Sequence, residues 1–300
     1  MTRHDTYFVS GGLRCAAWHY PATSDALATR AGRPCVVMAN GFGGTRDTGL
    51  QGFAESFSAA GIDVYLFDFR HFGDSEGEPR QLISVPRQRQ DFHAAVDAAR
   101  RLPGVDRDRI ALWGSSYSAG HAIVVAAQSP FLSGVVAMTP FTDGLASLVY
   151  ISRIGSPKHT ARLAVLGAAD LIQAGLGKGA RTIPITGPPG TDAMMTAPGV
   201  AEAYTAAAGP TWRNATPARH ALAMPRNRPT AYATKVDCPV LVQVAKADKT
   251  VPNKATRKMA AKLDKGRIEE YPVDHFDVYD GPWHRRVVAA QLEFLTRVLR

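Results

Sequence analysis

The chain has 300 residues, of which 45% are hydrophobic, and a formal net charge of +9 at pH 7. This length accommodates one globular core with an insertion, and the sequence contains no run of about 18 apolar residues that would span a membrane. Net charge alone says little about partners, and basic residues do not cluster with aromatic ones. We therefore expect neither a nucleic acid nor a membrane as a partner.

Strand and helix patterns alternate along most of the chain, after an opening hairpin around Gly11 and Gly12. The expected strands are residues 7–9, 13–20, 34–39, 63–67, 109–114, 134–139, 237–245 and 267–272. Helical patterns cover residues 86–102 and 119–127, and a turn is expected at 104–108. Such alternation implies a mostly parallel central sheet flanked by helices, which is an α/β fold.

The loop after strand 34–39 is rich in glycine, with the sequence Asn-Gly-Phe-Gly-Gly at residues 40–44. Glycine lets the backbone approach a ligand closely. Taken alone, this loop would be interpreted as an ordinary glycine turn. A role in binding requires a reactive group elsewhere in the chain for the loop to approach.

Residues 113–118, Trp-Gly-Ser-Ser-Tyr-Ser, lie between an apolar strand and an apolar helical run. A strand, a tight turn with a serine and a helix are the layout of a nucleophile elbow, which needs small residues two positions before and after the nucleophile. Ser115 fails because Trp113 and Tyr117 occupy those positions. Ser118 passes on size, but the strand pattern ends at the glycine, which favours Ser116. The alternative is a plain strand–helix turn whose hydroxyls cap the helix.

An elbow nucleophile needs two backbone N–H groups that hold the developing oxyanion. The residue after the nucleophile, Tyr117, is expected to supply one of them. The second is expected from the early glycine loop, where many hydrolases have His-Gly and this chain has Asn-Gly, and we assign it to Phe42. The position of the loop ahead of the elbow favours this role over that of an ordinary turn.

The pattern changes between residues 141 and 235, where prolines and glycines separate short helical stretches. This segment is too long to be a simple loop. We predict a core formed by residues 1–140 and 236–300, and a helical cap, residues 141–235, between the sixth and seventh core strands. The apolar cap residues either line an acyl pocket or form the cap's own core, the more common arrangement. They are Phe141, Tyr150, Met194, Met195, Tyr204 and Trp212.

The cap is basic, with ten Lys and Arg residues against four Asp and Glu residues. One interpretation is a negatively charged substrate or carrier, such as a carboxylated ester, a CoA thioester or an acyl carrier protein. The other is an arginine-rich solvated surface. We favour the second, because charge runs are usually solvated.

Two residues near the end of the chain complete a catalytic set. Asp248 comes after the late strand 237–245 and is followed by a proline, and His275 comes after the last strand, 267–272. The chain order Ser116, Asp248, His275 is the order expected for an elbow serine. Histidine can take the serine proton and return it to the leaving group near neutral pH. A solvated loop carboxylate is the alternative for Asp248.

The remaining histidines and the cysteines have structural interpretations. His71 and His121 are expected to pack or to donate hydrogen bonds, and no histidine spacing suggests a metal site. Cys15, Cys35 and Cys238 fit buried apolar positions in a reduced cytosol. The segment Met1–Asp5 lacks an apolar signal region, which also favours a cytoplasmic location.

The motifs together resemble the α/β-hydrolase superfamily. The glycine loop, residues 68–75 (Asp-Phe-Arg-His-Phe-Gly-Asp-Ser), the elbow, Ala247-Asp248 and Asp274-His275-Phe276 occur in superfamily order. Residues 73–81, 115–121 and 275–279 are most similar to bacterial serine hydrolases near the dienelactone-hydrolase and Xaa-Pro-peptidase-like groups. They are also similar to the fungal polyketide transferase and thiohydrolase group. The resemblance implies an α/β-hydrolase fold with a lid.

From these residues we expect a serine hydrolase that cleaves the ester or thioester bond of a small acyl substrate through an acyl-enzyme, without a metal or organic cofactor. One alternative is a transacylase that uses the same triad, and another is a non-catalytic binding protein of the same fold. Serine at the elbow argues against haloalkane and epoxide hydrolysis. Amide hydrolysis is less expected, because nothing marks a subsite for a peptide amino terminus. A homodimer is a further expectation, since hydrolases with exposed edge helices often pair.

Overall fold

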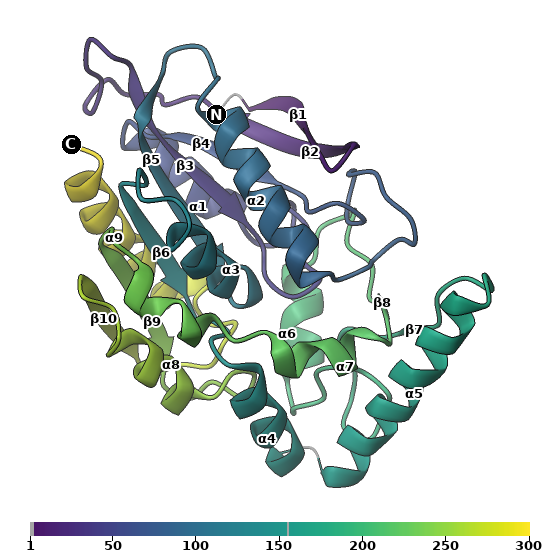
Figure 1. Ribbon diagram of the computed structural model, residues 1–300. Helices are drawn as coiled ribbons and strands as arrows, with labels where there is room; N and C mark the ends of the chain where they lie inside the picture. The colour runs from purple at the N-terminus through teal and green to yellow at the C-terminus, as the bar shows by residue number, and fades with distance from the viewer. Residues whose placement is uncertain (1–2, 155) are drawn as a thin grey trace.

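The computed structural model describes residues 3–154 and 156–300, so the first two residues of the N-terminal segment considered above lie outside the described part. An eight-stranded sheet has the order β1-β2-β4-β3-β5-β6-β9-β10. Its strands are β1 (His4–Ser10), β2 (Leu13–Tyr20), β3 (Arg33–Ala39), β4 (Asp63–Phe67), β5 (Val105–Ser115), β6 (Gly134–Met138), β9 (Val240–Ala245) and β10 (Gly266–Tyr271). β1 and β2 are antiparallel, and the other six strands run parallel to one another. The predicted α/β architecture is therefore confirmed (Figure 1).

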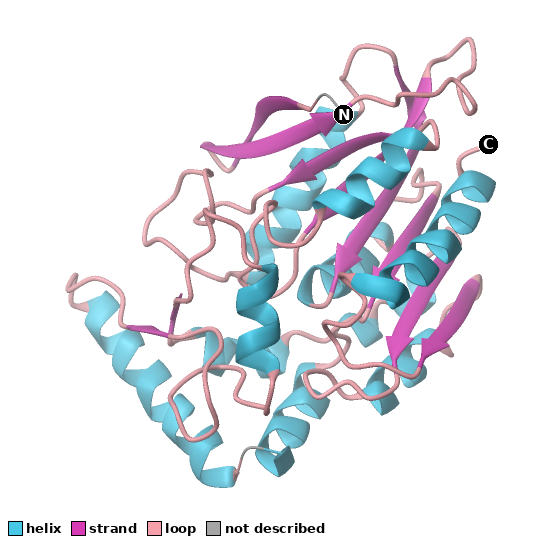
Figure 2. Cartoon of the chain, turned by 180° about the vertical axis from the view of Figure 1, so that it is seen from behind, coloured by secondary structure: helices cyan, strands magenta, loops and turns pink. Residues whose placement is uncertain are grey.

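Helices cover both faces of the sheet because the buried strands are apolar on both sides. The helices of the core are α1 (Gln51–Ala59), α2 (Val85–Ala99), α3 (Tyr117–Ala126), α8 (Asn253–Ala260) and α9 (Gly281–Val298). Alternate residues of β3 show the division: Cys35 and Val37 belong to one hydrophobic cluster, and Val36 and Met38 to the other. The first cluster includes residues of α2 and α3, and the second includes residues of α1 and α9. Figures 1 and 2 view these two faces from opposite sides.

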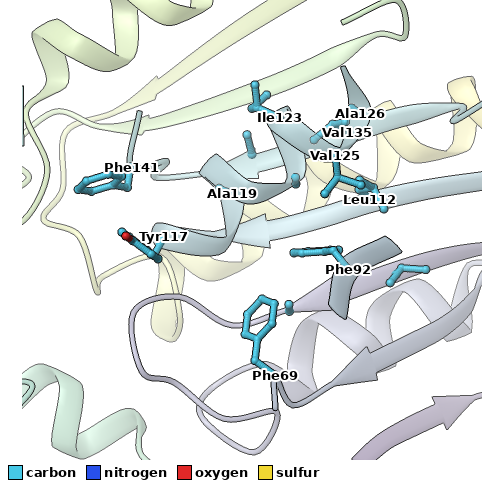
Figure 3. Close-up of a cluster of buried hydrophobic side chains, with 14 of the residues drawn as sticks. Phe69, Phe92, Leu112, Tyr117, Ala119, Ile123, Val125, Ala126, Val135 and Phe141 are labelled. Carbon is cyan, nitrogen blue, oxygen red and sulfur yellow. The ribbon is translucent and has the colours of Figure 1, made fainter. Parts of the chain in front are cut away.

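The helix α3 is buried along its whole length, which is unusual for a helix on the face of a sheet. Figure 3 shows Ile123 and Val125 of this helix among the apolar side chains of the strands and of α2. At the start of the helix, the rings of Tyr117 and Phe141 lie 4.8 Å apart between centroids. The helix that carries the elbow is therefore held by the core on one side and by the beginning of the cap on the other.

Several element boundaries differ from those expected. β5 begins at Val105, so the predicted turn at 104–108 is wrong beyond its first residue. The strand extends to this residue because Val105 pairs with Arg33 of β3 after a register shift. The helices α1, α8 and α9 were not among the predicted elements.

Between β6 and β9 the described residues form four helices, α4 (Gly144–Ile154), α5 (Pro157–Gly175), α6 (Val200–Ala207) and α7 (His220–Ala223). A two-stranded sheet, β7 (Thr182–Ile183) and β8 (Thr216–Pro217), and three short 3-10 turns complete this segment. α5 begins with Pro157 in its first turn, and the Ser156 side chain accepts a hydrogen bond from the His159 amide. Figure 1 shows α5 at the outer edge of the molecule, away from the sheet.

Three further features concern the whole chain. The three cysteines are buried and unpaired. Burial raises the pKa of the Cys15 thiol to about 12 and that of Cys238 to about 11. Among the described residues, no helix combines the length and the apolar character needed to cross a membrane.

Candidate active site

The turn between β5 and α3 holds Ser116 in a backbone conformation that few residues adopt. Its φ is 53° and its ψ is −112°, which a serine tolerates only where the surrounding structure enforces it. The Ser116 amide donates to Met138 O at 2.8 Å, and its carbonyl accepts from Phe141 N at 2.9 Å. A Cβ atom on Gly114 would lie 2.6 Å from the Ala119 amide nitrogen, which explains the small residue at that position.

The three neighbouring serines have different environments. The Ser118 hydroxyl donates to Ala39 O at 2.7 Å and accepts from the Ser115 amide at 2.9 Å, and its side chain is fully buried. The Ser115 hydroxyl forms a hydrogen bond with the hydroxyl of Tyr279. Ser116 is the serine of this turn that lines a cavity. The structure therefore gives Ser115 and Ser118 packing roles and leaves Ser116 accessible to a ligand.

His275 and Asp248 meet although 27 residues separate them in the sequence. The Nδ1 atom of His275 lies 2.6 Å from Asp248 Oδ2, and both side chains are buried. The other carboxylate oxygen of Asp248 accepts hydrogen bonds from the amides of Thr250 and Val251 at 2.6 and 2.8 Å. These bonds fix the orientation of the carboxylate toward the imidazole, so a carboxylate-oriented histidine is present.

The elbow serine and the histidine face one cavity. Ser116 and His275 both line it, together with Gly41 and Phe42 of the glycine loop. Its volume is about 20 Å³, which is room for about one water molecule. Among the described residues, no hydrogen bond forms between Ser116 Oγ and His275 Nε2. Such contacts commonly tighten only when a substrate is bound.

The glycine loop is held against the elbow by Asn40. Its side-chain amide donates to Thr45 O at 2.9 Å and to Thr48 O at 2.6 Å, and its oxygen accepts from the Gly41 amide at 2.7 Å. A Cβ atom on Gly41 would lie 3.0 Å from Ser116 Cβ, so the loop passes as close to the serine as glycine allows. The sequence marked Asn40 only as a departure from His-Gly. Its burial and its three hydrogen bonds are visible in the structure alone.

The residues after the loop are tied to the segment 68–75. The Arg46 guanidinium forms ion pairs with the buried carboxylate of Asp68 and with Asp74, and the Arg46 amide donates to Asp68 Oδ1 at 2.6 Å. The segment 68–75 therefore supports the glycine loop through Arg46, and none of its residues lines the cavity. The Nε2 atom of His71 lies 3.1 Å from Nη1 of Arg87. Burial lowers the pKa of His71 to about 4.

Cap residues close the cavity from the side opposite the sheet. Met195 and Tyr204 line it, and the Tyr204 hydroxyl donates to Phe42 O at 2.8 Å. Trp212 stacks on Tyr204 with 5.0 Å between ring centroids. Tyr150 donates from its hydroxyl to Asp248 O at 2.8 Å. Two of the six apolar cap residues named from the sequence therefore line the cavity, and the other four do not.

Two buried histidines lie at the elbow helix, His121 within α3 itself and His220 of α7 beside it. His121 Nε2 lies 3.0 Å from Gln88 Oε1, and burial lowers its pKa well below the usual value. His220 of α7 is also buried, which lowers its pKa to about 4. Neither histidine lines the cavity. Within the described residues, no group of three or more His, Cys, Asp or Glu side chains is arranged to hold a metal ion.

Comparison with known proteins gives the chain a family. A family model described as serine aminopeptidase, S33, matches residues 31–286. The quorum-quenching protein AidA of Acinetobacter baumannii is 36% identical over 297 residues, which cover 98% of this chain and 95% of that protein. The thiohydrolase aneE of Aspergillus aculeatus is 37% identical over 113 residues, which cover 38% of this chain and 36% of that protein.

The fold has a counterpart among solved structures. The α/β hydrolase GrgF from a Penicillium species superposes with a TM-score of 0.82 at 21% identity, covering all of this chain and 99% of that chain. This likeness confirms the predicted α/β-hydrolase fold.

Proposed function

We propose that this chain, which belongs to the serine aminopeptidase S33 family of α/β hydrolases, cleaves the ester or thioester bond of a small acyl substrate with Ser116, His275 and Asp248. The observation that carries the proposal is the buried 2.6 Å contact between His275 Nδ1 and Asp248 Oδ2, on the cavity that Ser116 lines. The relatives described as a quorum-quenching protein and a thiohydrolase support a hydrolytic reaction.

In the first step, Ser116 Oγ attacks the substrate carbonyl carbon while His275 Nε2 takes the hydroxyl proton. Asp248 holds the imidazole in the tautomer with a proton on Nδ1 and stabilises the imidazolium that forms. The carbonyl oxygen becomes an oxyanion, which the backbone N–H groups of Phe42 and Tyr117 stabilise. In the described part of the chain, neither N–H has a hydrogen-bond partner, so both are free to donate to it.

In the second step, His275 returns its proton to the departing alcohol or thiol, and the acyl group remains on Ser116. Water then enters, loses a proton to His275 and attacks the acyl carbon. Collapse of this second oxyanion releases the carboxylic acid, and the proton on His275 returns to Ser116.

The test is turnover of 4-nitrophenyl acyl esters and matched thioesters by the full chain, with Ser116→Ala as the control. We expect turnover that depends on Ser116, and an acyl adduct on the intact protein whose mass disappears in the variant. Equal turnover by the variant would exclude Ser116 as the nucleophile.

A second candidate is acyl transfer to an alcohol or amine on the same residues. The observation that favours it is a relative described as the polyketide transferase af380 of Aspergillus fumigatus, which is 34% identical over 144 residues covering 48% of this chain. Product analysis with and without added alcohols separates the two reactions. New ester in the presence of the alcohol indicates transfer, and free acid alone indicates hydrolysis.

A further inference from the structure

A groove opens beside the catalytic cavity and shares its wall. Its volume is about 900 Å³, and Ala207, Phe276 and Tyr279 line both the groove and the cavity. The walls come from three segments: the end of α6 with the residues after it, the residues that come after His275, and residues 47–52 at the start of α1. Because the cavity has room for about one water molecule, most of an ester bound at Ser116 must extend beyond it, and this groove adjoins it directly.

The groove lies on the side of the leaving group. The departing atom takes its proton from His275, so the leaving group must lie against that residue. The residues directly after His275, from Phe276 to His284, form one wall of the groove. The aromatic rings of Phe276, Tyr279 and Trp283 provide an apolar surface there. An alcohol or thiol that leaves the acyl carbon, while the acyl group stays on Ser116, therefore has its path through this groove.

The charges on the groove are negative. Asp47, Asp277 and Asp280 line it, and no lysine or arginine does so among the described residues. None of these three aspartates takes part in an ion pair of the described chain. Asp277 and Asp280 are exposed, whereas Asp47 is buried and accepts a hydrogen bond from the Thr211 amide at 2.9 Å. The nearby cation of Arg286 stacks over the Trp283 ring, 4.7 Å from its centroid.

The positive charge of the cap lies elsewhere. Ion pairs at 2.6 and 2.9 Å join Arg219 to Asp170 and Arg228 to Asp143. Arg153 and Arg228 line a different groove between α4 and α8, together with Lys254 and Lys258. The net positive charge of the chain therefore does not describe the surface that a leaving group meets.

We propose that this groove holds the leaving group and selects a neutral or cationic one over an anionic one, so that CoA thioesters and other anionic carriers are poor substrates. The inference rests on the proposed function, because it needs Ser116 as the nucleophile and His275 as the proton donor. The groove defines the binding site, and the aspartates determine its preference for charge.

The test compares pairs of substrates that share one acyl group. Choline and 3,3-dimethylbutyl esters have leaving groups of the same shape that differ by one positive charge. CoA and N-acetylcysteamine thioesters differ by the anionic nucleotide portion. At low ionic strength we expect a higher kcat/KM for the choline ester than for its neutral partner, and a lower kcat/KM for the CoA thioester than for its neutral partner.

The variant that tests the charges is Asp277→Asn/Asp280→Asn. Asparagine still accepts the hydrogen bonds that these side chains receive from the amides of Asp274 and Gly281, and it caps a helix as well as aspartate does. A unit charge about 8 Å away in water changes a binding constant about twofold, so removal of two should lower the choline-to-neutral ratio of kcat/KM about fourfold. This difference should largely vanish at about 0.5 M salt.

The matched control is Asp97→Asn. Asp97 is exposed near the end of α2, ahead of β5, whereas Ser116 lies just after β5, so the two lie at opposite ends of that strand. This variant should leave the choline-to-neutral ratio unchanged. A ratio that is equally unaffected by the double variant would overturn the groove proposal, and so would a CoA thioester that is hydrolysed faster than its N-acetylcysteamine partner. Failure of the proposed function gives a different result, because no substrate of the series would then show turnover that depends on Ser116.

Discussion

The Nε2 atom of His220 lies 3.2 Å from the hydroxyl oxygen of Tyr117. The same imidazole packs against Phe42, with 5.2 Å between ring centroids. A histidine of the cap therefore contacts the side chains of both residues whose amides we propose as oxyanion donors. Because all three side chains are buried, a change in this histidine affects the cap and the oxyanion site together.

Replacement of His220 should change how stability depends on pH. Burial lowers the pKa of His220 to about 4, so the folded protein keeps it neutral while the unfolded chain protonates it below about pH 6.5. This contribution to stability is present above pH 6.5 and is lost as the pH falls toward 4. Between pH 7 and 5, the wild type should lose about 2 kcal/mol more of its free energy of unfolding than His220→Gln does.

Urea unfolding at several pH values checks this difference. Glutamine keeps a polar group for the Tyr117 hydroxyl and does not titrate. The control is His4→Gln, because His4 is exposed on β1, far from the cap in sequence. Parallel pH profiles for the wild type and His220→Gln would contradict the prediction.

Ser116→Ala should abolish turnover, whereas Ser118→Ala should only reduce it. The Ser118 hydroxyl ties the elbow to Ala39 O at the end of β3, so its loss loosens the turn without removing the nucleophile. Steady-state kcat for one ester checks the order of the two effects. A fully active Ser116→Ala paired with an inactive Ser118→Ala would move the nucleophile to Ser118.

Asp248→Asn should cost less than His275→Ala, although both should lower kcat by orders of magnitude. We expect losses of about 10⁴-fold and about 10⁶-fold, because the asparagine still positions the ring whereas the alanine removes the base. Asparagine also favours the wrong tautomer of the imidazole. Single-turnover acylation rates measure both effects, and equal losses would mean that the carboxylate does more than orient the histidine.

Asn40→Asp should separate the two roles of this side chain. The aspartate keeps an acceptor for the Gly41 amide but loses the donors to Thr45 O and Thr48 O. Thr45 O keeps the hydrogen bond from the Thr48 amide at 3.0 Å, whereas Thr48 O is left unpaired, so stability should fall by about 1 to 3 kcal/mol. If the Phe42 amide shifts with the loop, kcat should fall by about 10²-fold with little change in KM. An unchanged kcat would remove Asn40 from the support of the oxyanion site.

The strands were predictable because buried strands of a parallel sheet are apolar on both faces. β4 agrees with its predicted bounds to the residue. The helix α8 was missed although its buried residues fall on one face; it has only eight residues, and several of the buried ones are small, such as Ala255 and Ala260. The helix α1 carried a usable signal in Phe53 and Phe57, which are four residues apart and both buried.

The proposed catalytic residues were accessible from the sequence because each comes after a parallel strand, and the carboxyl ends of such strands meet at one edge of the sheet. The contacts that support these residues could not be predicted from the sequence. His220 reaches Tyr117 across 103 residues, and Tyr279 reaches Ser115 across 164. No local pattern marks such pairs, since only the packing of the cap on the core brings them together.

The three buried cysteines have a practical consequence. Thiol reagents attack the thiolate, and the raised pKa values together with burial keep Cys15, Cys35 and Cys238 unreactive toward them. The native cysteines therefore need not be replaced before new cysteines are introduced for labelling. Cysteines introduced at the exposed residues Ala168 of α5 and Asp97 of α2 would accept a pair of spectroscopic labels. The distance between those labels would report, during turnover, whether the cap moves relative to the sheet.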